Sequence, residues 1–478
     1  MTDLPPNKTK IVCTIGPASE SQEVLEAMLL AGMNVARLNF SHGDFEGHKR
    51  VMDTLRAASR STGRRVAIMA DLSGPKMRIG KLREEPVELE EGKTFTLTTR
   101  QILGDASTAA VSFSRLPEAV KSGDALYLND GFIQLEVLAV TGDEVRCKVV
   151  VGGELRSRKG LNLPGIDLGI SAFTDRDREC LRFALEHGVD AVSQSFVESG
   201  QDIAAVRRAA KELGHAPFII AKIERAGALD RMESILQEAD GIMIARGDLG
   251  VEIPIEQMAV VQKRLMGQAN LLGKPVITAT QMLESMTTYR RPTRAEATDV
   301  ANAILDGTDC VMLSGESAMG KYPVQSVAML AKIAAAIEPH RPASRVRDAL
   351  KQARREERVS LTELIASSVE AAMESVTPAV VMVPTRSGAT ARSISRYRLP
   401  VWIAGVSSLE ATCQKLQFTY GVFPVCEPDH PEDWRGYARK WLKDHGVKGD
   451  LVILTEGPSS KHPDANNRME LMELCRRE

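Results

Sequence analysis

An arginine, two glycines and two carboxylates follow an apolar segment in the run DGIMIARGDLGVEIP, residues 240–254. The apolar part predicts a strand, and the turn that follows it leaves backbone N–H groups able to bind an anion. Asp248 and Glu252 add oxygens of the kind that bind a hard divalent cation. The pattern predicts a site for an anionic substrate and a metal ion at this strand end.

A second carboxylate ends the preceding apolar segment, FIIAKIE at 218–224. Alternate residues of a strand face the same side, so Lys222 and Glu224 share a face. Neighbouring parallel strands lie about 4.8 Å apart, which lets Glu224 and Asp248 share one Mg2+ or Mn2+. The alternative is an ordinary ion pair of Glu224 with Lys222 or Arg246, and spacing alone leaves both possibilities open.

Eight short apolar segments that each end in polar residues are expected to position these groups. They are 10–16, 34–39, 66–72, 190–196, 218–224, 241–248, 275–281 and 310–316. Most gaps between them have helical patterns, such as the capping box of Thr293 and Glu296 before a helix that ends at Gly307. This layout predicts an α/β fold, a (β/α)8 TIM barrel with the active site at the C-terminal strand ends.

The third gap differs, because residues 73–163 alternate polar and apolar and contain turn residues at 129–131 and 141–143. Such segments are typical of β hairpins. We therefore predict an all-β domain at 73–163, inserted into a barrel formed by 1–72 and 164–340. At the barrel mouth it would act as a lid that excludes water.

Residues 341–478 are predicted to form a third domain. The charge-rich stretch 338–360 indicates a linker with an exposed helix. A helix and several apolar strands then alternate, which predicts a C-terminal α/β sandwich. The helix is expected at 361–376 and the strands at 379–384, 401–406, near Phe423 and at 451–455.

Composition excludes several function classes. The 478 residues have a net charge of −2, so no basic surface for nucleic acid is expected. The start, MTDLPPNKTK, does not match a signal peptide, and no run of about 18 apolar residues predicts a membrane span, so we expect a soluble, cytoplasmic protein. Seven scattered cysteines fit neither a disulfide framework nor a CxxC metal site.

Several longer motifs match one known family. They are KTKIVCTIGPAS at 8–19, MNVARLNFSHG at 33–43, AKIE at 221–224, ITATQMLESM at 277–286 and RRPTRAEATDVANAILDGTDCVMLSGES at 290–317. Together they resemble pyruvate kinase over most of the chain. The resemblance implies transfer of the phosphoryl group of phosphoenolpyruvate to ADP, giving ATP and pyruvate in the last step of glycolysis, by a homotetramer.

The resemblance also implies residue roles. Glu224 and Asp248 hold Mg2+ or Mn2+, and Lys222 places its ammonium on the transferring phosphoryl group. Arg37 and Arg78 bind the substrate phosphate.

The backbone of Gly247 and Asp248 receives the substrate carboxylate in this comparison. Thr280 matches the network that delivers a proton to the enolate, with Ser314 and Glu316 on the same pathway.

Nucleotide contacts are implied for Asn39, His42 and Arg78. The family often has a tyrosine a few residues after the histidine, but Gly47 stands there in this chain. Met319 replaces a common lysine, so no role is transferred to it.

Many pyruvate kinases require K+, at positions that match Asn39, Ser41, Asp71 and the carbonyl of Leu72. The relatives commonly have a glutamate where this chain has Lys76. The lysine ammonium would supply the charge of the bound cation, so K+ is predicted to be dispensable.

A possible site for a phosphorylated effector lies in the segment VPTRSGATAR, which resembles the effector loop of allosteric relatives. Its hydroxyls and N–H groups suit a phosphate. The residues concerned are Thr385, Arg386, Ser387, Gly388 and Thr390.

Two other functions remain open on the sequence. One is another divalent-metal barrel enzyme that acts on phosphoenolpyruvate or pyruvate. The second is a catalytically silent, pyruvate kinase-like binding protein.

Overall fold

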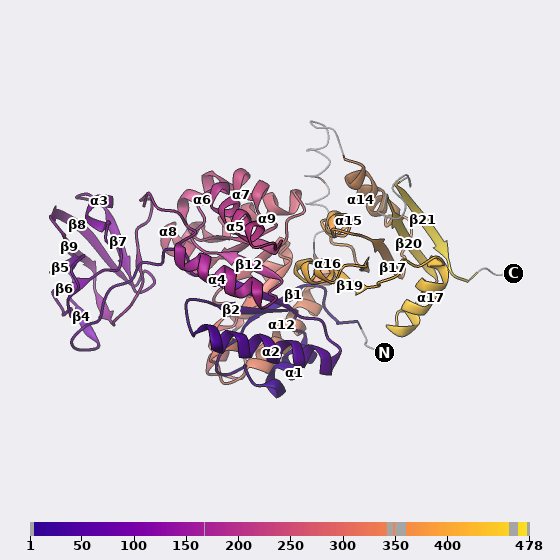
Figure 1. The fold of residues 1–478 in the computed structure, drawn as a ribbon, viewed down its shortest axis with the longest axis horizontal. Helices are drawn as coiled ribbons and strands as arrows, with labels where there is room; N and C mark the ends of the chain where they lie inside the picture. Colours follow the sequence, from indigo (N-terminus) through magenta and orange to yellow (C-terminus); the bar gives the residue numbers. More distant parts are fainter. Residues whose placement is uncertain (1–3, 167, 342–347, 349–359, 458–466, 476–478) are drawn as a thin grey trace.

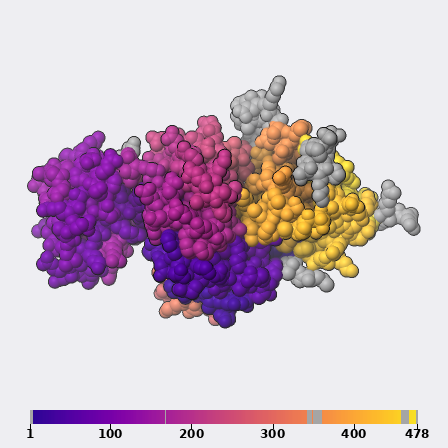
Figure 2. Space-filling view, viewed as in Figure 1, coloured from indigo at the N-terminus to yellow at the C-terminus, as the bar shows by residue number. Residues whose placement is uncertain are grey.

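Three lobes lie in a row in the computed structural model of the chain (Figure 1). The barrel is in the middle, the inserted domain lies at one end and the C-terminal domain at the other, and the space-filling view shows each as a distinct lobe (Figure 2). The structure describes residues 4–166, 168–341, 348, 360–457 and 467–475. No helix in these ranges is long and apolar enough to cross a bilayer.

Eight parallel strands close the barrel in the order β1-β16-β15-β14-β13-β12-β3-β2, which confirms the predicted fold. Most strands end earlier than predicted, because the polar residues that follow them turn out of the sheet. The strands are β1 (Lys10–Thr14), β2 (Val35–Asn39), β3 (Ala67–Leu72), β12 (Ala191–Gln194), β13 (Phe218–Ile223), β14 (Gly241–Ala245), β15 (Val276–Ala279) and β16 (Cys310–Leu313).

Helices surround this barrel, and α10 (Arg294–Asp306) begins at the cap that the sequence predicts. The capping box of Thr293 and Glu296 is present, and Gly307 ends that helix with φ 105°. The helices are α1 (Gln22–Ala31), α2 (Phe45–Thr62), α4 (Asp175–Glu186), α5 (Gly200–Glu212), α6 (Ala226–Asp230), α7 (Met232–Glu238), α8 (Arg246–Glu252), α9 (Met258–Leu271), α10 (Arg294–Asp306), α11 (Gly315–Ala318) and α12 (Pro323–Ile337).

The inserted domain is built on a six-stranded sheet, in the order β11-β7-β8-β9-β5-β6, with β10 and β4 paired beside it. The hairpin turns predicted at 129–131 and 141–143 are present. The sheet is mixed, because β5 and β6 run parallel, and a helical turn, α3 (Leu116–Ala119), interrupts the strands. The strands are β4 (Val87–Leu89), β5 (Thr94–Thr98), β6 (Thr108–Ala110), β7 (Ala125–Leu128), β8 (Ile133–Thr141), β9 (Glu144–Val151), β10 (Gly153–Leu155) and β11 (Leu161–Asn162).

The C-terminal domain has a five-stranded sheet in the order β19-β18-β17-β20-β21. The last strand is antiparallel and was not predicted, since its residues RMELME are mostly polar or exposed. Its elements are α14 (Leu361–Ala372), β17 (Val380–Pro384), α15 (Ala389–Ser395), β18 (Trp402–Ser407), α16 (Glu410–Lys415), β19 (Val422–Cys426), α17 (Trp434–Asp444), β20 (Leu451–Glu456) and β21 (Arg468–Glu473). The predicted linker helix within 338–360 falls mostly outside the described residues, and the exact domain boundaries stay predictions.

Candidate active site

A charged cleft of about 110 Å³ lies at the C-terminal ends of the barrel strands. It brings together most of the residues that the sequence analysis selected from segments far apart in the chain. Those that line it are Arg37, Asn39, Ser41, His42, Asp71, Lys76, Arg78, Lys222, Glu224, Asp248, Thr280 and Ser314.

Lys222, the next-to-last residue of β13, lines this cleft. Its Nζ lies 2.9 Å from Glu224 Oε1 and 3.4 Å from Asp71 Oδ1, and it donates to Ser195 Oγ at 2.7 Å. Burial by itself would lower the pKa of Lys222, but the two carboxylates outweigh it and raise the pKa. The side chain is therefore a fixed ammonium, held by acceptors on three strands.

Glu224 and Asp248 come from adjacent strand ends and converge on the same side of the cleft. Glu224 is 1% exposed, and its Oε2 accepts a hydrogen bond from Phe196 N at 2.8 Å. Burial raises the pKa of Glu224, and the Asp248 charge raises it further against the opposing effect of Lys222. Two carboxylates that repel each other in a cleft fit a bound divalent cation, which would relieve the repulsion.

Of the two ion pairs that the sequence left open for Glu224, only the one with Lys222 is present. Glu224 does pair with Lys222, but the Arg246 guanidinium turns away and pairs with Asp299 at 2.7 Å. No group of three or more candidate ligands occurs in the described ranges. Two carboxylates leave coordination positions for substrate oxygens, as Mg2+ sites usually do.

Arg37 and Asp71 form a buried pair on β2 and β3. Arg37 Nε donates to Asp71 Oδ2 at 2.9 Å, and its Nη1 donates to Thr14 Oγ1 at 2.8 Å. Ser193 Oγ donates to the other carboxylate oxygen at 2.6 Å. Burial would raise the pKa of Asp71, but Arg37 and Lys222 lower it overall, so the carboxylate stays ionised and fixes the guanidinium at the cleft wall.

The predicted monovalent-cation positions already have protein donors. Ser195 Oγ donates to the Leu72 carbonyl at 2.7 Å, and Ser41 N donates to Asn39 Oδ1 at 3.1 Å. Lys76 is exposed and lines the same cleft. Burial lowers the pKa of His42, and the charges of Arg78, Lys76 and Arg37 lower it further, so the mouth of the cleft is strongly positive.

Gly247, in the first turn of α8, contacts Thr280, the residue that follows β15. Gly247 N donates to Thr280 Oγ1 at 2.8 Å, and the Thr280 hydroxyl donates to the Ala279 carbonyl at 2.6 Å. A substrate carboxylate would therefore compete with Thr280 for the Gly247 N–H. Glu316 is fully buried below them and accepts from Ser314 N at 2.7 Å.

The predicted effector loop joins β17 to α15 in the C-terminal domain, away from the cleft. Gly388 has φ 80° and its N–H donates to Thr385 Oγ1 at 2.9 Å. Ser387 Oγ accepts from Ala389 N at 3.4 Å, while the side chains of Arg386 and Ser387 are exposed.

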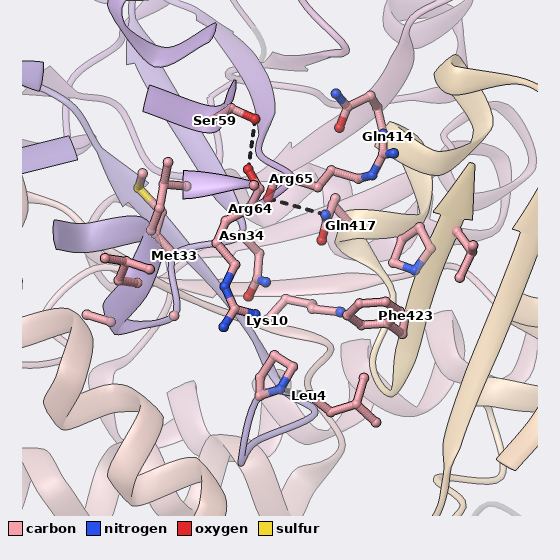
Figure 3. A pocket seen from close by; sticks show the side chains of 18 of the residues that line it. Leu4, Lys10, Met33, Asn34, Ser59, Arg64, Arg65, Gln414, Gln417 and Phe423 are labelled. Carbon is pink, nitrogen blue, oxygen red and sulfur yellow. Dashed lines mark hydrogen bonds between the residues drawn. The ribbon is translucent and has the colours of Figure 1, made fainter. Parts of the chain in front are cut away.

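A larger cavity, of about 640 Å³, lies at the opposite end of the barrel against the C-terminal domain (Figure 3). Lys10 extends toward Phe423 and Arg65 toward Gln414 across the domain boundary (Figure 3). Lys10 Nζ donates to the Val422 carbonyl at 2.6 Å, and Arg65 pairs with Glu410. Size alone would select this cavity, but the convergent charges lie in the smaller cleft.

Two polar residues of the cleft were not selected from the sequence. Ser193 and Ser195 donate to Asp71 and Leu72 and are fully or almost fully buried. Their signal was available, because two serines at i and i+2 in the apolar segment 190–196 must point to one face of the strand.

Comparisons with known proteins agree with this geometry. The family model "Pyruvate kinase, barrel domain" matches residues 6–327, and "Pyruvate kinase, alpha/beta domain" matches residues 363–472. A pyruvate kinase of Thermococcus litoralis is 48% identical over 99% of this chain and 100% of its own length. One of Geobacillus stearothermophilus is 42% identical over 97% of this chain and 80% of its own. The crystal structure of a pyruvate kinase from Cryptosporidium parvum superposes with a TM-score of 0.91 at 37% identity, covering 98% of this chain and 97% of that one.

Proposed function

Because the chain belongs to the pyruvate kinase family, whose activity is phosphoryl transfer between phosphoenolpyruvate and ADP, we propose that the cleft around Lys222 is where this transfer takes place. The observation that carries the proposal is the convergence of Lys222, Glu224 and Asp248 with Arg37 at the C-terminal ends of the barrel strands. Phosphoryl transfer needs positioning and charge neutralisation more than covalent help, and this cleft supplies both.

Glu224 and Asp248 would hold Mg2+ or Mn2+, which when bound neutralises the substrate carboxylate and phosphate. Lys222 places its ammonium at the moving phosphoryl group, and Arg37, kept rigid by Asp71, binds that group from the other side. Arg78 adds a second guanidinium at the phosphate. These side chains orient the phosphoryl group in line with the acceptor.

The carboxylate of phosphoenolpyruvate binds at the start of α8, on the N–H groups of Gly247 and Asp248. It takes the Gly247 N–H from Thr280, which frees the threonine hydroxyl to take part in protonating the enolate carbon. Ser314 and Glu316 lie behind it. Asn39, His42 and Arg78 face the nucleotide phosphates, and Gly47 provides no ring for the base.

The test is ATP formation from phosphoenolpyruvate and ADP by the full-length protein. Activity with Mg2+ that disappears in Glu224→Ala and Asp248→Ala supports the proposal. Turnover of phosphoenolpyruvate by a lyase or carboxyl-transfer reaction would identify a different barrel enzyme, and no turnover at all would identify a silent paralogue.

Lys76 makes K+ dispensable in this proposal. The Asp71 carboxylate is already neutralised by Arg37 and Lys222, and Lys76 adds a positive charge at the position where relatives commonly have a glutamate. At 4 Å and an effective dielectric of 20, one unit charge corresponds to roughly 4 kcal/mol. We expect nearly full activity with tetramethylammonium as the only monovalent cation, and K+ dependence in Lys76→Glu. A wild-type enzyme that loses most of its turnover without K+ would contradict this role.

The remaining parts of the proposal concern regulation and assembly. The hydroxyls of the 385–390 loop, of which that of Ser387 is exposed, suit a phosphorylated effector. Membership of the family implies a cytoplasmic homotetramer. Size-exclusion chromatography with light scattering tests the tetramer, and a monomer that is fully active would contradict it.

A further inference from the structure

Arg246, the first residue of α8, makes an unusual set of contacts that the proposed chemistry does not use. Its Nη2 donates to the Thr280 carbonyl at 2.7 Å and to the Gln281 carbonyl at 3.4 Å, and its Nε donates to the Ala279 carbonyl at 3.3 Å. One guanidinium thus donates hydrogen bonds to three consecutive backbone carbonyls at the end of β15. Asp299 on α10 holds it from the other side, at 2.8 Å and 2.7 Å.

The turn to which Arg246 donates has a strained backbone. Thr280 has φ 71° and Gln281 has φ 53°, both in the left-handed region that favours glycine. A β-branched residue is especially disfavoured there, and such conformations persist only where the surroundings enforce them. The carbonyl contacts of Arg246 enforce this conformation, because the Ala279 and Thr280 carbonyls belong to the two peptide planes that flank Thr280 and the Gln281 carbonyl to the next one.

The strained turn decides where the Thr280 hydroxyl points. In this conformation Oγ1 reaches the Gly247 N–H at 2.8 Å and lines the cleft that holds Lys222 and Asp248. A relaxed right-handed conformation would turn the threonine side chain away from this position. Arg246 and Gly247 are adjacent in the chain, so one residue of α8 holds the turn while the next contacts its hydroxyl.

We propose that Arg246 is a positioning residue that holds the Thr280 hydroxyl in place for protonation of the enolate carbon. The inference rests on the role proposed above for Thr280, and it adds the residue that maintains the geometry. The other explanation is a structural ion pair that only attaches α10 to the barrel. Asp299 is 39% exposed, so that pair is partly solvated and does not by itself account for the three carbonyl contacts.

Arg56 provides a matched control at the other end of the barrel. It also pairs with an aspartate, Asp190, at 2.8 Å, and donates to two carbonyls, of Val66 at 3.2 Å and Gly188 at 2.9 Å. Its contacts, one aspartate and two carbonyls, are of the same kind as those of Arg246, but it does not line the cleft. Arg56→Met should therefore lower the melting temperature and leave turnover within about twofold of wild type, since no reacting group depends on it.

The experiment compares kinase turnover with deuterium uptake at C3 of pyruvate, in the presence of Mg2+ and inorganic phosphate. Arg246→Met should lower proton exchange by about 100-fold, the size typical of general acid-base effects, with a much smaller change in KM for phosphoenolpyruvate. Arg246→Lys should recover part of the loss, because one ammonium cannot reach three carbonyls. Asp299→Asn should lower proton exchange only about fivefold, since the hydrogen bonds of Arg246 to the carbonyls remain.

A double variant separates positioning from a general structural effect. If Arg246 acts through Thr280, exchange in the Arg246→Met, Thr280→Ala double variant should equal that of Thr280→Ala alone. Guanidinium ions added to Arg246→Ala should restore part of the exchange, and methylammonium ions should restore less, because an ammonium cannot bind three carbonyls at once. Electron paramagnetic resonance of bound Mn2+ should give wild-type affinity, which shows that the variant is folded with its metal site intact.

The outcomes distinguish the inference from the function on which it rests. Exchange that survives in Thr280→Ala would remove the proposed role of Thr280. Exchange lost in Thr280→Ala but kept within twofold in both Arg246→Met and Arg246→Lys would overturn the role of Arg246 alone. Losses that add fully in the double variant would likewise show that Arg246 does not act through Thr280.

Discussion

The two ends of the barrel use the same kinds of side chain for opposite purposes. At the C-terminal end, Arg37, Lys222, Glu224 and Asp248 converge in a small cleft, where burial, and in addition the Asp248 charge, raise the pKa of Glu224. At the N-terminal end the cavity is larger, but charged side chains that line it already have partners. Lys10 donates to the Val422 carbonyl, and Arg65 pairs with Glu410. Unbalanced charge, more than volume, marks the site of chemistry.

Backbone strain follows the same division. Phe196, Thr280 and Gln281 are left-handed non-glycine residues at the C-terminal strand ends, and two of them position cleft groups directly. At the other end, Arg398 also has a left-handed backbone, but its guanidinium forms a buried ion pair with Asp309 at 2.7 Å. Strain at one end orients reactive groups, and at the other it serves the contact between domains.

The largest expected effect is at the metal carboxylates. Glu224→Ala or Asp248→Ala should lower turnover by more than about 1,000-fold, because the cation links both substrate anions to the barrel. Turnover is measured across a Mn2+ titration, with Glu410→Ala at the opposite end as the matched acidic control. Near-wild-type rates in either cleft variant would show that the ligands are assigned wrongly and would remove the contrast between the two ends.

Lys222→Met should suppress phosphoryl transfer much more than proton exchange. Its ammonium is proposed to stabilise the moving phosphoryl group, and a lost charge-assisted contact of this kind costs about 100-fold or more in rate. The two rates are measured on one preparation. Exchange that falls as far as kinase turnover would make Lys222 the proton donor and Thr280 redundant.

Substitutions at the N-terminal end of the barrel should change the stability of the protein and not its turnover. Burial lowers the pKa of Lys10 from 10.5 to about 8. Below pH 8 the Lys10 ammonium is therefore charged while buried, which destabilises the folded state. As pH rises through 8, the folded state loses this proton while the unfolded state keeps it up to about 10.5, and stability rises by roughly 3 kcal/mol at most. Lys10→Met should therefore melt higher than wild type at pH 7, by a margin that shrinks toward pH 10. A margin that is constant with pH would mean that Lys10 is not charged when buried.

The smallest effect is expected at the 385–390 loop. Ser387→Asp or Thr390→Asp should raise the half-maximal concentration of any phosphorylated activator about tenfold, by placing like charge beside the phosphate. Sugar phosphates and AMP are screened against wild type first. Hyperbolic kinetics with no response to any of them would leave the loop a structural turn.

Much of the fold could be predicted because local patterns report it directly. The eight apolar segments, the capping box at Thr293 and the hairpin turns of the inserted domain each depend on neighbours in sequence, and the structure confirms them. Strand β21 was missed because its stability comes from pairing with β20 and not from its own polar residues. The inserted segment was predicted as an all-β domain with hairpin turns, and the parallel pairing of β5 with β6 was not predicted because it depends on contacts across the sheet.

The sequence by itself determined which groups are available for chemistry and at which strand ends they emerge, because strand periodicity and the parallel order of a barrel leave little freedom. Only the tertiary structure decided how these groups are held. Phe196 N on Glu224, the serines on Asp71 and Leu72, and Arg246 on three carbonyls of the Thr280 turn all join segments far apart in the chain. Such contacts follow from the closure of the barrel, which brings distant strand ends within hydrogen-bonding distance. A local pattern can show which face a side chain is on, as for the two serines, but not which distant atom it meets.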